Sequence, residues 1–273
     1  MCRWMAYKGK SVYLDEWLLN TEHSLIDQSK SADMTKYEVN GDGFGVGWYG
    51  QKSEPGLFRS IRPAWNNANL KSLATHVSSP LFLAHVRAAT GTPIQETNSH
   101  PFQYKNWLMV HNGLIHKFAR VKKEILSLID ADYFSNICGS TDSELLFYLL
   151  LTNGLQQDIG SAVAKTIEQI EFIATKHQIK PALRMTLGIS NGDSLWAVRY
   201  SSHATSSTLF YSIEQEENQP CLLIVSEPLD SCDRCWTPVD ENTILHFDRD
   251  NNINISQIES FNEIVAEKSI TKC

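Results

Sequence analysis

The sequence lacks a hydrophobic run long enough to cross a membrane. Its longest apolar stretch extends from Leu145 to Leu151, whereas a transmembrane helix needs roughly 20 apolar residues in succession. Residues 1–30 also lack the uninterrupted apolar core of a secretory signal peptide, because charged residues recur between positions 3 and 16. We therefore expect a protein that is not integral to a membrane and is not exported, and we expect it in the cytoplasm.

Blocks of basic residues are absent as well. The 24 Lys and Arg are outnumbered by 31 Asp and Glu, which gives a formal net charge of −7 at pH 7. A phosphate backbone or an anionic membrane surface attracts clusters of positive charge, so the composition argues against nucleic acid as a partner. Hydrophobic residues at 42% and charged residues at 20% are typical of a globular protein and exclude a disordered or fibrous chain.

Cysteine is scarce and scattered. The six cysteines do not form the dense framework that stabilises small secreted domains, which agrees with a reducing compartment. Cys232 and Cys235 have the spacing of metal ligands, but no second pair of this kind completes a set of four. We interpret them as a chance pair or a minor redox pair, and we expect neither a metal ion nor a cofactor.

Linkers of low complexity, internal repeats and abrupt changes of composition are also missing, so we expect residues 2–273 to form a single domain. Short apolar runs bounded by Gly, Pro, Asn and Ser predict strands, and Asn191-Gly192 between two such runs predicts a hairpin. Apolar residues at helical spacing predict helices. The predicted strands are 2–7, 44–50, 56–61, 81–86, 107–111, 183–190, 195–200, 208–213, 221–226 and 243–247, and the predicted helices are 14–19, 121–128, 143–152 and 159–173.

The order of these elements indicates the fold class. Strands come first, helices follow, and strands return at the end, with hairpins where strands adjoin. This order favours an antiparallel α+β sandwich over a doubly wound parallel sheet. Two sheets packed face to face between helical layers would account for both halves of the chain.

Three separated stretches contain polar residues in an order that chance explains poorly. They are FLAHVRAATGTPIQETNSHPF at 82–102, MVHNGLI at 109–115 and GSTDSELL at 139–146, and they follow a cysteine at position 2. Taken singly, each has an ordinary interpretation: a surface arginine, a turn after a strand and the cap of a helix. Their joint appearance calls for a common explanation.

Together these stretches resemble the N-terminal-cysteine, or class II, glutamine amidotransferase family. The family pattern runs Cys near the start, Arg-x-x-Thr, His-Pro, His-Asn-Gly and Thr-Asp. The resemblance covers about residues 2–230. It is closest to the stand-alone members, which include a hydrolase of ergothioneine biosynthesis and a component of a glutathione-degrading complex, because HSLIDQS at 23–29, NGDGFGVGWY at 40–49 and SEPLD at 226–230 are similar to their segments. It implies the four-layer αββα sandwich of N-terminal nucleophile hydrolases.

The resemblance implies that Cys2 is the nucleophile. Removal of Met1 would leave an α-amine, with a pKa of about 7.7–8.0, on the same residue as a thiol with a pKa of about 8.5, so the amine can take the thiol proton near neutral pH. Attack on a side-chain amide would give an oxyanion and then a γ-glutamyl thioester, which water hydrolyses. By the resemblance, Asn112 and Gly113 form the oxyanion hole, which stabilises this charge because its donors are fixed in advance.

The same resemblance assigns the residues that bind the substrate. Arg87 and Thr90 would bind the α-carboxylate, for which a guanidinium fork is suited, and Asp142 would bind the α-ammonium. His100 matches a family histidine near the pocket, and we include it among the substrate-binding residues, with a structural histidine as the alternative.

Two positions depart from the family pattern, and one glycine-rich stretch does not have the function that its glycines suggest. Ala88 and Gly91 stand where sugar-phosphate-making members tend to have Trp and His, so we transfer no role to these positions. The glycines of NGDGFGVGWY do not form a phosphate loop, because the Lys-Ser/Thr ending is absent. We expect them instead to let a sheet pass close beneath the substrate.

We therefore predict an amidohydrolase that acts on the γ-amide of glutamine or of a γ-glutamyl compound. We expect no second catalytic domain to use the ammonia, which leaves two possibilities: a partner protein receives the ammonia, or water completes a simple hydrolysis. A third hypothesis is a catalytically silent glutamine-binding sensor or regulatory subunit. The complete set of Cys2, Arg87, Asn112, Gly113 and Asp142 argues against it, because a binding module needs no nucleophile.

Overall fold

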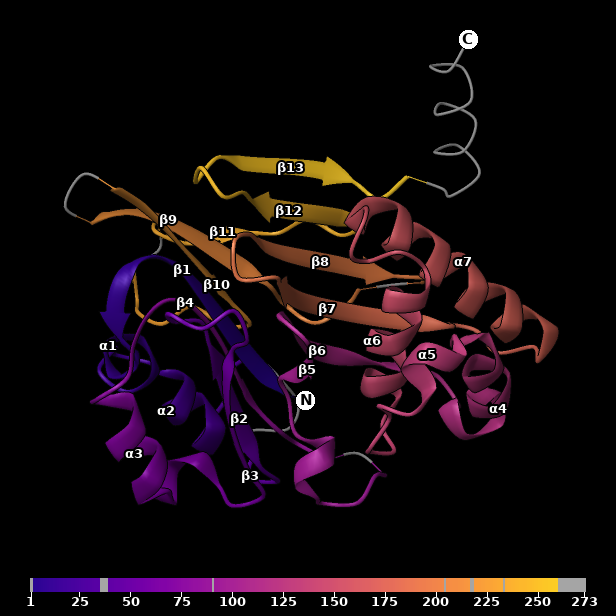
Figure 1. Ribbon diagram of the computed structural model, residues 1–273, viewed down its shortest axis with the longest axis horizontal. Coiled ribbons are helices and arrows are strands. Elements are labelled where there is room, and N and C mark those ends of the chain that lie inside the picture. The colour runs from indigo at the N-terminus through magenta and orange to yellow at the C-terminus, as the bar shows by residue number, and fades with distance from the viewer. Residues whose placement is uncertain are drawn as a thin grey trace, which may run out of the picture.

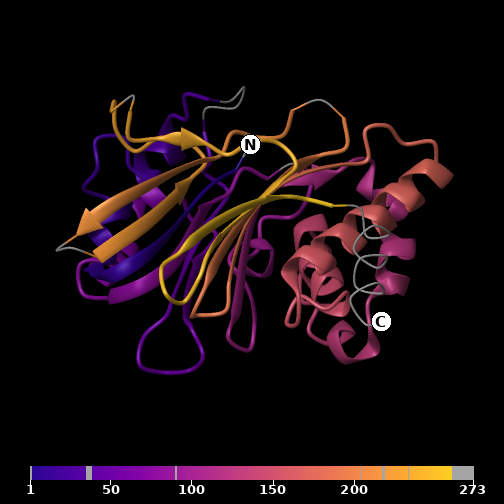
Figure 2. The same ribbon diagram turned by 90° about the horizontal axis from the view of Figure 1, so that it is seen from above.

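The computed structural model of the chain describes residues 2–34, 39–89, 91–203, 205–216, 219–232 and 234–259. Two antiparallel sheets pack face to face, and helices cover both outer faces (Figure 1). Seen from above, the indigo and purple helices lie on one side of the sheets and the magenta and salmon helices on the other (Figure 2). The α+β sandwich with four layers, expected from the order of elements, is confirmed.

The first sheet has the strand order β11-β9-β10-β1-β4-β2-β3, with antiparallel pairing between neighbours. Its strand β1 follows Cys2 directly and pairs on both sides, with Arg3 opposite Val86 and Met5 opposite Val225. The position of Cys2 is therefore fixed by two neighbouring strands. The strands are β1 Arg3–Tyr13, β2 Phe44–Trp48, β3 Gly56–Ser60, β4 Ser78–Val86, β9 Phe210–Glu216, β10 Gln219–Val225 and β11 Thr237–Pro238.

The second sheet has the order β13-β12-β8-β7-β6-β5. The predicted hairpin is present, and Gly192 in its turn has a φ of +95°, which favours glycine. The predicted strand 107–111 extends to Ile115, so His-Asn-Gly lies inside a strand and does not form a turn. The strands are β5 Phe102–Tyr104, β6 Trp107–Ile115, β7 Leu183–Ser190, β8 Leu195–Ser201, β12 Thr243–Phe247 and β13 Ile253–Gln257.

Helices of the first third of the chain cover the first sheet, and later helices cover the second. The most apolar helix, α6, is buried on all sides from Ser143 to Leu151, which explains the longest apolar run of the sequence. None of the helices in the described part of the chain has the length and hydropathy of a membrane span. The helices are α1 Leu14–Leu18, α2 Leu25–Lys30, α3 Ala68–Ala74, α4 Phe118–Leu128, α5 Ala131–Phe134, α6 Asp142–Thr152 and α7 Ile159–Lys176, with short 3-10 turns at Ala64–Asn66 and Glu96–Asn98.

A hydrogen-bonded link through the core joins the two sheets. Trp4 of β1 is fully buried in the cluster between the sheets, and its indole nitrogen donates to the hydroxyl of Thr186 on β7 at 3.0 Å. The same hydroxyl donates to the carbonyl oxygen of Asn112 on β6 at 3.2 Å. The strand that follows the predicted nucleophile is thereby tied to the strand of the predicted oxyanion hole.

This link gives the first prediction. Thr186→Val keeps the shape of the side chain but leaves the buried indole N–H of Trp4 without its acceptor, so we expect the free energy of unfolding to fall by about 1–3 kcal/mol in urea denaturation. Thr186→Ser removes a methyl group and keeps the hydroxyl, so its free energy of unfolding should fall by less. Equal losses in the two variants would show that packing, and not the hydrogen bonds, stabilises this position.

Candidate functional site

The residues predicted for catalysis and binding gather around one pocket of about 520 Å³. Cys2, Arg87, His100, Gly113 and Asp142 line it, although they come from both sheets, from a loop and from a helix. The Asn112 side chain is buried on the same strand as Gly113. Thr90, the remaining predicted residue, lies outside the described residues.

Cys2 is half-buried, and its thiol contacts the backbone of Ala88. The Sγ atom lies 3.4 Å from the Ala88 nitrogen, which donates to it, and 3.6 Å from the Ala88 carbonyl oxygen. Burial raises the pKa of the Cys2 thiol, and the Ala88 N–H together with the charges of Arg87 and Arg3 offsets part of this rise. The thiolate is the reactive form of a cysteine, so a reaction at this thiol needs a base.

Arg87 is held by loops on two sides. Its side chain is 3% exposed, and its Nη2 atom donates to the Thr92 hydroxyl at 2.7 Å and to the Pro93 carbonyl at 3.2 Å. Its Nη1 atom donates to the Asp42 carbonyl at 3.4 Å. A guanidinium has five N–H donors, so these contacts orient the group and leave donors for an anion in the pocket.

Asp42 fastens the segment that carries Arg87, a role that the sequence alone did not reveal. Its carboxylate accepts from the Ala89 nitrogen at 2.8 Å, and its own backbone nitrogen donates to the Arg87 carbonyl at 2.9 Å. The backbone nitrogen of Arg87 donates to the carbonyl oxygen of Gly43, the residue after Asp42, at 2.8 Å. The sequence feature that could have pointed to this role is the Asp of NGDGFGVGWY, because it stands directly before a glycine and a strand.

The glycines of this segment allow close contacts with neighbouring parts of the chain. A Cβ atom at Gly45 would overlap the carbonyl oxygen of His100, and one at Gly47 would overlap the side chain of Leu108. Gly43 has a φ of +116° and also lies against the backbone of Ser60. The glycines therefore admit the loop of His100, a residue that lines the pocket, and the opposite sheet.

Asn112 and Gly113, the residues predicted to form an oxyanion hole, lie side by side in β6. Asn112 is 2% exposed, and its side-chain nitrogen finds no acceptor among the described residues. A buried amide without an acceptor is rare, so this nitrogen keeps a hydrogen bond that it can donate. Gly113 is required by its surroundings, because a Cβ atom there would overlap the Arg184 carbonyl oxygen and the His111 ring.

Asp142 is the first residue of α6, after the helix cap Thr141. One carboxylate oxygen accepts from the Ile115 nitrogen at 2.8 Å, and the other accepts from the Ser143 nitrogen at 2.9 Å. Each oxygen of a carboxylate can accept two hydrogen bonds. Asp142 is therefore fixed in orientation and keeps acceptor capacity for an ammonium group.

Three buried histidines lie together beside the pocket. The ring of His100 is 4.0 Å from the ring of His85 and 6.5 Å from that of His111, measured between centroids. His111 bonds to the Ser143 hydroxyl at 2.8 Å, whereas the ring nitrogens of His85 and His100 make no hydrogen bond of ordinary geometry with the described residues. Burial lowers the pKa of all three rings, to about 3 for His85. All three are therefore neutral at pH 7.

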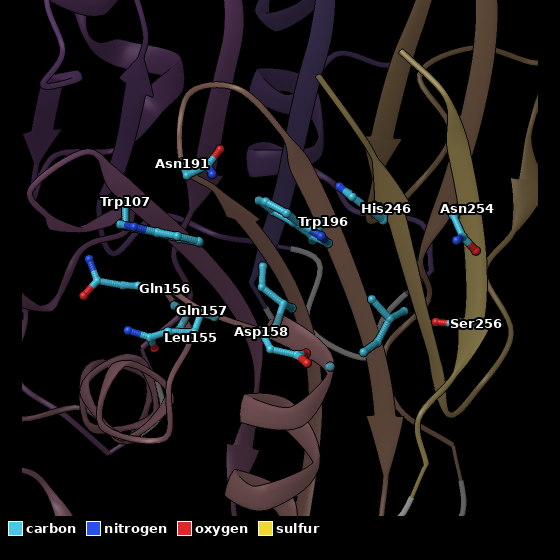
Figure 3. Close-up of a pocket in the computed structure, with 13 residues that line it drawn as sticks. Trp107, Leu155, Gln156, Gln157, Asp158, Asn191, Trp196, His246, Asn254 and Ser256 are labelled. Carbon is cyan, nitrogen blue, oxygen red and sulfur yellow. The ribbon is translucent and has the colours of Figure 1, made fainter. Parts of the chain in front are cut away.

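Two other features lie away from this site. Cys232 and Cys235 are joined by a disulfide, which favours a redox pair over a chance pair. A second pocket of about 440 Å³ lies between the start of α7 and the second sheet (Figure 3), where the ring of Trp196 stacks against those of Trp107 and His246. It shares none of its lining residues with the pocket of Cys2.

Several known proteins are similar to this chain in sequence. Residues 24–215 match the family model described as glutamine amidotransferases class-II. The chain is 34% identical over 290 residues to the probable glutamine amidotransferase DUG3 of Saccharomyces cerevisiae, with 90% of this chain and 81% of that protein covered. It is 28% identical over 247 residues to the gamma-glutamyl-hercynylcysteine sulfoxide hydrolase of Mycolicibacterium smegmatis, with 90% and 95% covered.

Solved structures show the same fold. A glutamine aminotransferase class-II domain protein from Silicibacter pomeroyi matches with a TM-score of 0.74 and 30% identity, over 94% of this chain and 100% of that chain. The glutamine phosphoribosylpyrophosphate amidotransferase of B. subtilis matches with a TM-score of 0.65 over 94% of this chain and 49% of that chain, and at 13% identity it supports the fold alone. These matches confirm the family resemblance and its sandwich.

The neutral histidines predict how stability depends on pH. Because their pKa values are lowered in the folded state, the unfolded state binds more protons below about pH 6.5, and the free energy of unfolding should fall as the pH falls from 6.5 to 5.5. Each ring contributes at most about 1.4 kcal/mol per pH unit. Urea denaturation across this range measures the slope. His85→Phe should reduce the slope by about one proton, and a slope equal to that of the parent would contradict the assignment.

Proposed function

The chain belongs to the class II glutamine amidotransferase family, and we propose that Cys2 is the nucleophile of its amidohydrolase reaction. The observation that carries this proposal is the meeting of Cys2, Arg87, Gly113 and Asp142 in one pocket. The family acts on glutamine or a γ-glutamyl compound, and a thiol, a cation and an anion line the same pocket. We also propose that residues 2–273 form one domain and that the protein acts in the cytoplasm, where a nucleophilic thiol stays reduced.

The first chemical step needs a base for a thiol whose pKa burial raises. Once Met1 is removed, the α-amine of Cys2 takes the thiol proton, and the sulfur attacks the γ-carbonyl carbon of the substrate. The oxygen of that carbonyl becomes negative, and the Asn112 amide and the Gly113 N–H donate to it. The leaving amine takes the proton from the α-amine as its bond to carbon breaks, which leaves a γ-glutamyl thioester on Cys2.

The charges in the pocket orient the substrate. Arg87, with Thr90 beside it in the sequence, binds the α-carboxylate, and Asp142 binds the α-ammonium. His100 is neutral and lines the same pocket, so it contributes shape and hydrogen bonding without a competing charge. Because both charged groups of the glutamyl unit are held, its γ-amide is directed at the thiol.

Hydrolysis of a γ-glutamyl amide is the outcome that we favour over transfer of ammonia to a partner protein. The pocket continues past the glutamyl-binding residues to Lys117, Phe118 and Arg120 at the start of α4, which leaves room for a leaving group larger than ammonia. The mycobacterial relative, nearly all of whose length the chain covers, is named as the hydrolase of such a compound. Water then cleaves the thioester and restores Cys2.

Cys2 provides the decisive test. We expect the mature protein to lack Met1 by intact-mass measurement and to form one adduct, on Cys2, with a γ-reactive glutamine analogue. Cys2→Ala should abolish turnover and adduct formation while its thermal midpoint stays close to that of the parent, because one small residue replaces another. Cys138→Ala, at an exposed free thiol, is the matched control and should react as the parent does. Turnover by Cys2→Ala would remove the nucleophile assignment.

The same protein preparation distinguishes the remaining alternatives. A γ-glutamyl amide cleaved at least about tenfold faster than glutamine in kcat/KM supports the hydrolase. Glutamine as the best substrate, with turnover that rises when cell extract is added, indicates an ammonia-accepting or complex-forming partner. Binding of glutamine without adduct or turnover indicates the sensor.

Asn112 gives a quantitative prediction for the oxyanion hole. Asn112→Ala removes one donor to the developing charge, so we expect kcat to fall by about 10²–10³ with a small change in KM. The hydrogen bond from Thr186 to the Asn112 carbonyl is a backbone contact and should survive the substitution. Steady-state kinetics on the best substrate measure both constants, and a change confined to KM would place Asn112 in ground-state binding instead.

A further inference from the structure

Segments that the proposed reaction does not use meet at one buried carboxylate, Glu227. It belongs to SEPLD, and HSLIDQS contacts it through Gln28, whose side-chain nitrogen donates to the Glu227 carbonyl at 3.3 Å, and through His23, whose Nε2 lies 3.4 Å from Oε2. The start of NGDGFGVGWY joins the same group, because the Asn40 nitrogen donates to the Ser29 carbonyl at 2.8 Å. Residues that lie far apart in the sequence therefore meet around this one carboxylate.

On one side, Glu227 is connected to the nucleophile. Arg3 and Glu227 form an ion pair in which each side chain is 1% exposed, and Arg3 Nε donates to Glu227 Oε1 at 2.6 Å. The Nη1 atom of Arg3 donates to the carbonyl oxygen of Cys2 at 2.9 Å. Glu227 therefore orients the guanidinium that holds the backbone of Cys2.

On the other side, Glu227 is bonded to the backbone that follows α2. Its carboxylate accepts from the nitrogens of Asp33 at 3.0 Å and Met34 at 2.9 Å. The carboxylate that orients Arg3 is therefore itself held in place by two backbone N–H groups.

The local chemistry keeps this carboxylate charged. Burial alone would raise the pKa of Glu227, but the charge of Arg3 and the two backbone N–H groups hold it below its ordinary value. The preceding residue supports the same strand, because the Ser226 hydroxyl accepts from the Trp4 nitrogen at 3.0 Å. A buried ion pair is a poor source of stability, since an apolar pair of similar volume often stabilises as well or better. Specific orientation is a better explanation for its presence here.

We propose that Glu227 is a positioning residue for the reaction: through Arg3 it fixes the carbonyl of Cys2. The thiol then keeps a fixed position in the pocket, which the attack on a bound γ-amide requires. This inference rests on the proposed role of Cys2 as nucleophile. It assigns a role to a residue that touches neither the substrate nor the reacting atoms.

Glu227→Gln tests the inference, because it keeps the size of the side chain and removes the charge that orients Arg3. We expect kcat to fall at least about tenfold while KM changes by less than about threefold, measured well below the thermal midpoint of each protein. Arg3→Lys should behave in the same way, since one ammonium cannot reach both Glu227 and the Cys2 carbonyl. The double variant should be no slower than the slower single variant, because both changes break one linkage.

Glu241→Gln is the matched control. Glu241 also pairs with an arginine, Arg199, at 3.4 Å and accepts a backbone N–H, that of Ser206, at 2.7 Å, but it does not line the pocket of Cys2. It should lose thermal stability and keep the kcat of the parent. If Glu227→Gln keeps kcat within about twofold of the parent, or loses no more kcat than Glu241→Gln does, the inference is overturned while the proposed function still stands. A parent with neither turnover nor a Cys2 adduct would instead overturn the proposed function, and the inference with it.

Discussion

The pairing of β1 on both sides is the constraint on which the rest of the site depends. A nucleophile in front of a strand has a defined position only if that strand is held, and β1 is hydrogen-bonded to β4 and to β10. The partner β4 also leads directly into Arg87 and Ala88, so the same register that fixes Cys2 places a guanidinium and a backbone N–H beside it. The positions of Cys2 and Arg87 thus follow from the order of strands in one sheet.

The pocket combines few charges with many neutral polar groups. Arg87 follows β4 of the first sheet, whereas Asp142 begins helix α6, and each is anchored by backbone groups that leave part of its bonding capacity unused. The histidines nearby are kept neutral by burial. A ligand with one cation and one anion would then be bound by Arg87 and Asp142 without a competing charge on the histidines beside them, which suits the amino-acid end of a glutamyl unit.

The sequence predicted the residues that line the pocket better than those that support them. Cys2, Arg87, Gly113 and Asp142 share one pocket as expected, because their spacing and order are characteristic. Asp42 and Glu227 were missed, since the groups that they contact lie far away in the sequence and leave no periodic pattern. The long helices and most strands were found from apolar spacing, whereas α2, α3 and α5 are short and lack a full stripe, and β13 is an exposed edge strand.

The link from Trp4 through Thr186 to Asn112 crosses the space between the sheets. Cys2 stands two residues before one end of this link, and Asn112 stands at the other. If Asn112 is the oxyanion donor that we propose, the spacing of the sheets, which core side chains set, also influences how far the sulfur lies from that donor. Small changes in core volume far from the pocket would then lower the reaction rate before they unfold the protein. Sequence divergence in the interior of related chains should therefore be limited by catalysis as well as by packing.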